Sequence, residues 1–184
     1  MKQDPEFLIF TGPMFGSKTT KMLAALERYK YRKMTVGAFK PRMDDRYSQG
    51  EIVTHSGLKW IATNVSTGKE ILAYANDYDV IAVDEAFMID DIAKILVQLF
   101  HQGKTIVVSS IQLSATGKIF DEIMWMMPWA TYIKVCPAVC PISGKDAYYT
   151  YRKIAGLSEI EVGGEELYEP RSWKHHPALS SQDE

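Results

Sequence analysis

The stretch that decides the fold reads GPMFGSKT and comprises Gly12, Pro13, Met14, Phe15, Gly16, Ser17, Lys18 and Thr19. It follows the apolar run 7–10, which predicts a short buried strand, and it precedes residues 19–33, whose apolar side chains recur at helical spacing. A glycine-bearing turn and a Lys-Thr pair between a strand and a helix are typical of a phosphate-binding P-loop. We therefore expect this stretch to bind nucleotide phosphates, with Lys18 at the outer phosphates and the Thr19 hydroxyl at Mg²⁺.

One position departs from the P-loop pattern G-x-x-x-x-G-K-[ST], which places glycine directly before the lysine. Ser17 occupies that position here, and Gly16 stands one residue earlier. The second glycine of the pattern often adopts a backbone conformation that is costly for other residues. Either the turn shifts by one residue, or nucleotide binding is weakened or lost; an ordinary strand–turn–helix with a surface Lys-Thr pair is the remaining alternative.

A second informative stretch runs from Tyr78 to Glu85, where four consecutive apolar residues are followed by Asp84 and Glu85. Such a run predicts a strand buried on both faces, as in a parallel sheet. Ligands of open α/β sheets bind at the carboxyl ends of the strands, and P-loop folds place a Mg²⁺-binding aspartate there. We expect Asp84 to share Mg²⁺ with Thr19 and Glu85 to act as a base; a solvated Asp-Glu pair is the alternative.

The remaining pattern predicts an α/β fold of the P-loop (RecA-like) type, a parallel sheet flanked by helices. Strands are expected at 35–40, 104–110 and 131–135, the last as a core strand, and helices at 67–76, 89–102 and 119–125, while 52–65 is ambiguous. Beyond Cys136, residues 147–152 and 159–162 predict two strands of a ribbon joined by 154–158. We divide the chain into a nucleotide-binding domain (1–135), a small β-ribbon or lasso subdomain (136–178) and a flexible tail (179–184).

Composition narrows the classes of function. The 184 residues carry a formal net charge of −2, which argues against a dedicated nucleic-acid binder, because such proteins show a basic excess. The sequence contains neither a run of 18 apolar residues nor a signal peptide, so we expect no membrane partner and a soluble, cytoplasmic protein. The two cysteines, Cys136 and Cys140, do not make a disulfide framework.

Further motifs follow the P-loop in a specific order. They are Lys40 with Asp44, Arg46 and Tyr47; Thr54-His55; Val83-Asp84-Glu85-Ala86; Gly117-Lys118-Ile119-Phe120; Ala138-Val139-Cys140; Ala147, Thr150 and Arg152; and Gly163-Gly164 with Tyr168. Each motif is weak alone, but together, from Phe7 to about His175, the chain resembles the type II thymidine kinases, a family of P-loop deoxynucleoside kinases.

The resemblance implies ATP-dependent phosphorylation of thymidine or deoxyuridine at the 5′-hydroxyl, with Mg²⁺ accompanying ATP. It implies that residues 12–19 hold the donor phosphates, that Thr19 and Asp84 hold Mg²⁺, and that Glu85 takes the hydroxyl proton. Asp44 and Arg46 would act near the transferring phosphoryl group. The lasso would cover a nucleoside that contacts Met14, Met88, Phe120, Val162, Gly163 and Tyr168. The family also implies a homo-oligomer, usually a tetramer, and residues 123–129 could serve such an interface or belong to the core.

Several positions depart from the family pattern around the nucleoside. The family has a glutamine and then an aromatic residue where this chain has Phe87 and Met88, and Ala115 replaces an aromatic residue over the base. The run 159–162 is out of phase by one residue with the family's strand. These departures leave two alternatives open: a P-loop kinase with altered nucleoside specificity, or a catalytically impaired relative that binds nucleotide or serves a structural role.

The family's structural zinc site is degenerate in this chain. Cys140 and His175 match two ligand positions, whereas Ser143 and Ser172 stand at the other two. Serine is not a zinc ligand in such sites. We therefore expect no structural zinc, and a different Cys₂His₂ site made by Cys136 and Cys140 with His175 and His176 is the alternative.

Overall fold

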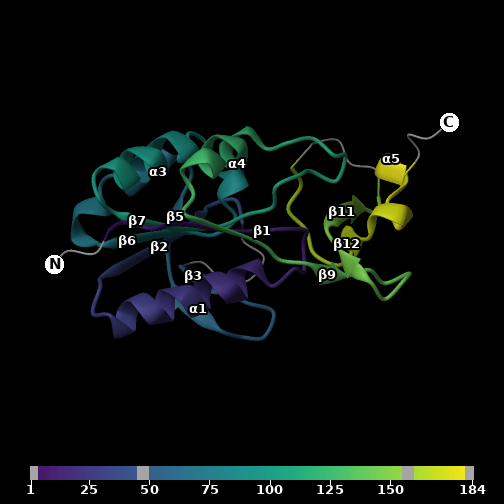
Figure 1. Ribbon diagram of the computed structural model, residues 1–184, viewed down its shortest axis with the longest axis horizontal. Coiled ribbons are helices and arrows are strands. Elements are labelled where there is room, and N and C mark those ends of the chain that lie inside the picture. Colours follow the sequence, from purple (N-terminus) through teal and green to yellow (C-terminus); the bar gives the residue numbers. More distant parts are fainter. Residues whose placement is uncertain (1–3, 45–49, 155–159, 181–184) are drawn as a thin grey trace.

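The structure, a computed structural model, describes residues 4–44, 50–154 and 160–180. Its centre is a six-stranded sheet in the order β5-β2-β6-β7-β1-β8, and every neighbouring pair in it is parallel. The strands are β1 (Phe7–Thr11), β2 (Val36–Pro41), β5 (Thr63–Val65), β6 (Val80–Val83), β7 (Thr105–Ser109) and β8 (Tyr132–Val135). Figure 1 shows the sheet between two layers of helices, which confirms the α/β P-loop fold class.

Helix α1 (Lys18–Tyr31) covers one face of the sheet, and α3 (Ile92–His101) and α4 (Asp121–Met126) cover the other (Figure 1). Alternate residues of β6 face these two layers: Ile81 and Val83 pack with α3, whereas Val80 and Ala82 pack with α1. All four are buried, as are all five residues of β7. Burial on both faces explains why these strands read as continuous apolar runs.

Residues 52–65, ambiguous in the sequence, contain three short strands. β3 (Glu51–Val53) and β4 (Lys59–Ile61) form an antiparallel hairpin outside the main sheet, and β5 joins the sheet edge beside β2. The helix predicted at 67–76 is shorter: α2 spans Gly68–Ile71 and is followed by a 3₁₀ turn, η1 (Ala75–Asp77). The other 3₁₀ turns are η2 (Ala86–Met88), η3 (Met127–Trp129) and η4 (Trp173–His175).

Strand β8 corrects one prediction, because it is not a core strand. In the part of the chain that the structure describes it pairs only with β1, and all four of its residues are exposed. Its apolar composition therefore reflects a sheet edge rather than a sheet centre. The neighbouring Trp- and Met-rich run 123–129 divides in a similar way: Ile123 and Met126 are buried, whereas Trp125 and Trp129 are exposed.

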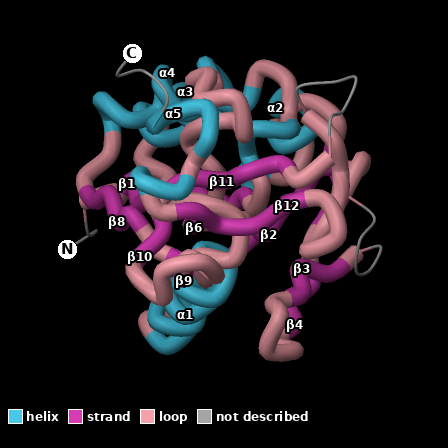
Figure 2. The backbone as a smooth tube through the Cα atoms, turned by 90° about the vertical axis from the view of Figure 1, so that its right-hand side faces the viewer, coloured by secondary structure: helices cyan, strands magenta, loops and turns pink. Residues whose placement is uncertain are grey.

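The C-terminal part of the chain contains two small antiparallel sheets, β9 (Ala138–Val139) with β10 (Asp146–Ala147) and β11 (Tyr149–Arg152) with β12 (Tyr168–Arg171). Figure 2 shows them in front of one end of the main sheet. The predicted ribbon is therefore wrong in its second strand, because β11 pairs with residues 168–171. The Lys153 N–H donates to the Leu167 carbonyl (2.8 Å), which extends this pairing and leaves 160–162 as a loop.

The first two residues of the predicted tail, 179 and 180, belong to a helix. Residues 179 and 180 complete helix α5 (Pro177–Ser180), while 181–184 lie outside the described residues. Among the residues that the structure describes, no helix combines the length and apolar character needed to cross a bilayer.

Candidate functional site

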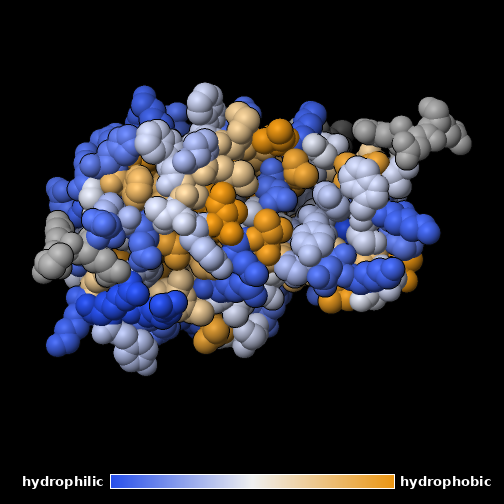
Figure 3. Space-filling view, in the orientation of Figure 1, coloured by the Kyte–Doolittle hydropathy of each residue, from blue (hydrophilic) through white to orange (hydrophobic). Residues whose placement is uncertain are grey.

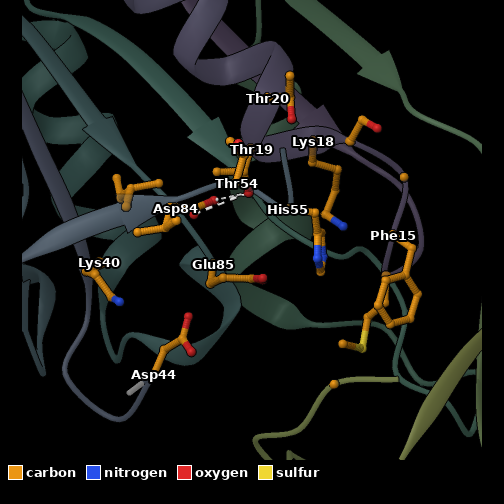
Figure 4. Close-up of a pocket in the computed structure, with 16 residues that line it drawn as sticks. Phe15, Lys18, Thr19, Thr20, Lys40, Asp44, Thr54, His55, Asp84 and Glu85 are labelled. Atoms are coloured by element: carbon orange, nitrogen blue, oxygen red, sulfur yellow. Dashed lines mark hydrogen bonds between the residues drawn. The ribbon is translucent and has the colours of Figure 1, made fainter. Parts of the chain in front are cut away.

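The carboxyl ends of β1, β2 and β6 open into a cleft of about 710 Å³, its solvent-filled mouth included. We call it the phosphate cleft; it is lined by residues 14–20, Lys40, Asp44, 52–55, Asp84, Glu85 and Gly164. In Figure 4 the side chains of Lys18, Asp44 and Glu85 come from three separate segments and surround the same space. Parallel pairing brings these segments together, because it places the ends of all three strands at one edge of the sheet.

The loop between β1 and α1 is left-handed at Phe15 (φ 63°) and at Ser17, not at Gly16. Ser17 has φ 57° and precedes Lys18, the first residue of the helix. The turn is therefore not shifted by one residue. Gly16 is needed for a different reason: a Cβ atom there would lie 2.3 Å from the backbone carbonyl oxygen of Cys136. Serine bears the conformational cost at residue 17, roughly 1–2 kcal/mol for a residue with a side chain.

One contact lies within the loop and a second ties its helix to β6. Lys18, only 6% exposed, donates from its ammonium group to the carbonyl of Pro13 at 2.6 Å. The Thr19 hydroxyl donates to Asp84, at 3.0 Å from Oδ1 and 3.3 Å from Oδ2 (Figure 4). Thr19 and Asp84, which the sequence predicts to share a site although they are far apart in the chain, are therefore in direct contact.

Asp84 lies in an environment that disfavours its charged form. Burial is the main cause, and the neighbouring Glu85 carboxylate adds to it; the Thr19 hydroxyl and the Lys18 ammonium oppose them, but the pKa still rises from 3.8 to about 7. A buried carboxylate with a raised pKa is stabilised by any cation that enters beside it. A cation beside Asp84 would therefore lower this pKa and favour the carboxylate form.

Glu85 lies on the boundary between the phosphate cleft and a second pocket. Its backbone is left-handed (φ 49°, ψ 44°), a conformation that costs a residue with a side chain about 1–3 kcal/mol and often marks functional sites. Glu85 and Met14 line both cavities. A group bound in the second pocket would therefore meet the phosphate cleft at the Glu85 carboxylate.

The second pocket, which we call the nucleoside pocket after the ligand that the sequence leads us to expect there, has a volume of about 430 Å³, its opening to solvent included, and is mainly apolar. Of the six residues expected at a nucleoside, five line it: Met14, Met88, Phe120, Gly163 and Tyr168. Val162 is not among its lining residues, although Ile160 and Glu161 are. The Phe87 and Phe120 rings pack on each other at 4.8 Å between centroids.

Other expected residues have different outcomes. Asp44 is buried in the phosphate cleft, whereas Arg46 lies outside the described residues. Sequence reasoning assigned no role to Lys40, His55 or Thr150, which line one or the other cavity. The position of Lys40 near the carboxyl end of a predicted strand could have identified it as a site residue. Thr150 comes from the C-terminal part of the chain and lacks that signal.

The four positions of the degenerate zinc site do converge. The Ser143 and Ser172 hydroxyl oxygens are 3.5 Å apart, and Ser172 Oγ lies 3.0 Å from Nδ1 of His175. Burial raises the pKa of the Cys140 thiol, but hydrogen bonds from the hydroxyls and backbone N–H groups of both serines outweigh it and lower that pKa to about 6. Two of the four side chains are serines, so this donor set does not fit zinc.

The alternative site with Cys136 is not assembled either. The Cys136 thiol packs under α1 and donates to the Lys134 carbonyl at 3.5 Å, whereas Cys140 belongs to a separate cluster with Ala138 and Ala147. Across residues 4–44, 50–154 and 160–180, no group of three or more His, Cys, Asp or Glu side chains is arranged to hold a metal ion.

The loop conformation predicts that substitutions at Ser17 and Gly16 have opposite effects on the free energy of unfolding. Ser17→Gly removes the left-handed cost and raises the free energy of unfolding by about 0.5–1 kcal/mol. Gly16→Ala introduces a Cβ against the Cys136 carbonyl and lowers the free energy of unfolding by about 1–3 kcal/mol. Urea unfolding of both variants measures these changes. Stabilisation by Gly16→Ala would contradict the loop geometry described here.

Asp84→Asn is expected to stabilise the apoprotein at high pH. The unfolded chain releases the Asp84 proton near pH 3.8 and the folded chain near pH 7, so the folded state binds more protons between them and stability falls as pH rises through this window. The stabilisation by Asn should be about 1–3 kcal/mol larger at pH 8 than at pH 5. Urea unfolding of both proteins at pH 5 and pH 8 checks this prediction. If the stabilisation by Asn were the same at both pH values, the prediction would be refuted.

Replacing both serines of the degenerate cluster should create a zinc site. Ser143→Cys with Ser172→Cys gives a Cys₃His set with Cys-x-x-Cys and Cys-x-x-His spacing, and we expect about one tightly bound zinc per chain. Elemental analysis of purified protein measures it, with Ser143→Ala/Ser172→Ala as the matched control. We expect neither the natural chain nor the alanine variant to retain zinc; stoichiometric zinc in either would show that the serines do not matter.

Comparison with known protein families gives a match over nearly the whole chain. The family model described as Thymidine kinase matches residues 6–176. The matched span includes the P-loop, the Asp84–Glu85 pair, both cavities and the Cys140 cluster.

Proposed function

The chain belongs to the thymidine kinase family, and from this premise we propose that it transfers the γ-phosphoryl group of ATP to the 5′-hydroxyl of thymidine or deoxyuridine. The observation that carries the proposal is the arrangement of two adjoining cavities. One has the residue types that bind phosphate, the other is apolar and lined by two phenylalanines, and Glu85 and Met14 line both. A donor and an acceptor bound in the two cavities would meet at Glu85.

Glu85 is the residue that we assign as the general base. A base must lie within hydrogen-bond reach of the proton that it takes, and the boundary between the cavities is where a 5′-hydroxyl would face the γ-phosphorus. The left-handed backbone at Glu85 supports the assignment, because strain of this kind is tolerated where it directs a side chain into a site. Asp44, buried in the same cleft, is proposed to act near the transferring group, and the family resemblance adds Arg46.

The phosphate cleft also supplies a donor set that fits Mg²⁺. Mg²⁺ prefers oxygen ligands and is usually held by one or two protein groups together with substrate phosphates and water. The Thr19 hydroxyl and the Asp84 carboxylate, within 3.0 Å of each other, are such oxygens, and Lys18 and the backbone of 12–17 would hold the phosphates. When bound with ATP, Mg²⁺ offsets charge on the β- and γ-phosphates. Phosphoryl transfer needs mainly this positioning and charge compensation.

From the family resemblance we propose that the nucleoside pocket accepts a pyrimidine deoxynucleoside, but two of its lining residues favour a broader specificity. Met88 and Ala115 line this pocket where the resemblance leads us to expect aromatic side chains. Their smaller or more flexible side chains favour a site that tolerates a larger base, since methionine adapts its shape readily. A kinase with altered nucleoside specificity is therefore the second candidate.

We also propose that the protein acts as a homo-oligomer, with a tetramer expected from the family. The exposed edge strand β8 supports assembly: Tyr132 is 49% exposed and Ile133 is 43% exposed, on a strand that pairs only with β1 among the described residues. An edge of this kind is a natural site for pairing with another chain. Trp125 and Trp129 add exposed apolar surface on the neighbouring segment.

The test of the proposal is transfer of labelled γ-phosphate from Mg-ATP to a panel of deoxynucleosides. We expect phosphorylated thymidine or deoxyuridine, and we expect Glu85→Gln to lower kcat by at least about 100-fold while ATP binding persists, because the variant keeps shape but loses the base. A control at Glu27, an exposed residue of α1, tests charge alone: Glu27→Gln should leave the rate unchanged.

Each other outcome of the panel selects one alternative. Transfer to a purine or cytosine nucleoside, but not to thymidine or deoxyuridine, would replace the proposed substrate with the altered specificity. Folded protein that binds ATP and transfers nothing to any nucleoside would identify a catalytically impaired relative. Full activity of Glu85→Gln would remove Glu85 from the role of base.

A further inference from the structure

His176 is a buried histidine to which the proposed reaction gives no role. It is only 1% exposed and follows the 3₁₀ turn η4, and its own carbonyl accepts hydrogen bonds from the Leu179 and Ser180 N–H groups of α5. The backbone on both sides of the residue is therefore fixed. Its ring lines a small cavity behind the P-loop, which Gly12 and Pro13 also line.

The His176 ring makes one hydrogen bond, and that bond goes to the backbone of β11. Its Nε2 atom lies 3.0 Å from the Thr150 carbonyl oxygen. A carbonyl can only accept, so Nε2 carries the proton and donates. The rings of Tyr149 and Tyr151 meet the imidazole edge-on at 6.2 Å and 6.0 Å between centroids. The imidazole thus packs between two side chains of the strand and beneath the peptide between them.

The register of the small sheet explains why Thr150 needs this donor. Thr150 lies opposite Pro170 in the β11–β12 pair. Hydrogen-bonded and non-hydrogen-bonded pairs alternate along an antiparallel ladder. Because the Lys153 N–H donates to the opposite Leu167 carbonyl, Thr150 and Pro170 form a non-hydrogen-bonded pair, and the Thr150 carbonyl faces away from β12. An unsatisfied buried carbonyl is costly, and His176 supplies the missing donor from another segment.

Thr150 in turn holds the P-loop. Its hydroxyl oxygen accepts a hydrogen bond from the Met14 backbone N–H at 3.0 Å, across 136 positions of sequence. Thr150 is 4% exposed, so water has little access to replace this bond. Met14 lines both the phosphate cleft and the nucleoside pocket. The carbonyl and the hydroxyl of one threonine therefore connect the C-terminal segment to the wall between the two substrates.

We propose that His176 is a positioning residue: it fixes Thr150, and through the Thr150 hydroxyl it holds Met14 at the wall between the phosphate cleft and the nucleoside pocket. The role in catalysis rests on the proposed kinase function. Small displacements of groups that align two substrates lower the rate of transfer more than they lower binding. The effect of losing His176 should therefore fall on kcat.

The chain offers a matched pair of variants at this position. The amide nitrogen of glutamine reaches the place of imidazole Nε2, whereas that of asparagine reaches only the place of Nδ1. In the structure, Nδ1 of His176 is buried and has no hydrogen-bond partner among the described residues. His176→Gln should therefore preserve the hydrogen bond to Thr150, and His176→Asn should lose it, although both variants place a neutral amide at the same position.

The kinetic experiment compares these variants in the transfer assay. We expect His176→Asn to lower kcat about tenfold with KM values for ATP and nucleoside within about threefold of the natural chain, and His176→Gln to restore kcat to within about threefold. Adding Thr150→Val tests the route: His176→Asn should have little further effect on kcat when the threonine hydroxyl is already absent. Additive losses, or equal kcat values for the Asn and Gln variants, would overturn the proposal.

A second measurement does not depend on transfer activity. Hydrogen exchange of the Met14 amide reports whether its bond to Thr150 is present. We expect His176→Asn to speed exchange at least about tenfold under conditions where the protein stays folded, and His176→Gln to change it by less than about threefold. Unchanged Met14 exchange in His176→Asn would overturn the positioning role, whereas the expected exchange in a protein without transfer activity would contradict only the proposed function.

Discussion

The hydrogen bond between the Thr19 hydroxyl and the buried Asp84 carboxylate is the interaction on which the site depends. It joins the start of α1 to the end of β6, across β7, and it exists because parallel pairing places the carboxyl ends of these strands at one edge. The sheet thus concentrates a hydroxyl, an ammonium group and two carboxylates in a small volume. Burial there raises the pKa of Asp84 to about 7, and a cation bound beside it would favour the charged carboxylate.

The same region contains the backbone strain of the site. Ser17 and Glu85 both adopt left-handed conformations without being glycine, one at each side of the phosphate cleft. The buried layers of the sheet supply the stability against which this strain is tolerated, since each fully buried aliphatic side chain contributes about 1.5–3 kcal/mol. Strain at these two positions fixes where the helix begins and where the Glu85 carboxylate points.

The C-terminal part of the chain supplies the residues that cover the nucleoside pocket, which the sheet leaves open. Thr150, Gly163 and Tyr168 close the nucleoside pocket over residues that follow β6 and β7. Cys140, Ser143, Ser172 and His175 hold the base of this part through hydrogen bonds. Loops covering a site exclude water from the transferring group, so the proposed function gives this part of the chain a role in the chemistry as well as in specificity.

The sequence alone determined the fold class, the P-loop and the Asp84–Glu85 pair, because continuous apolar runs and a glycine-bearing Lys-Thr turn carry local signals. It did not reveal that β8 is an exposed edge, that β11 pairs with 168–171, or that Ser17 rather than Gly16 is left-handed. Those facts depend on contacts between distant segments: the Cys136 carbonyl that excludes a side chain at Gly16, and the pairing of β11 with β12, which leaves the Thr150 carbonyl facing away from β12 and toward His176. Local pattern specifies elements, whereas their partners are decided only when the whole chain packs.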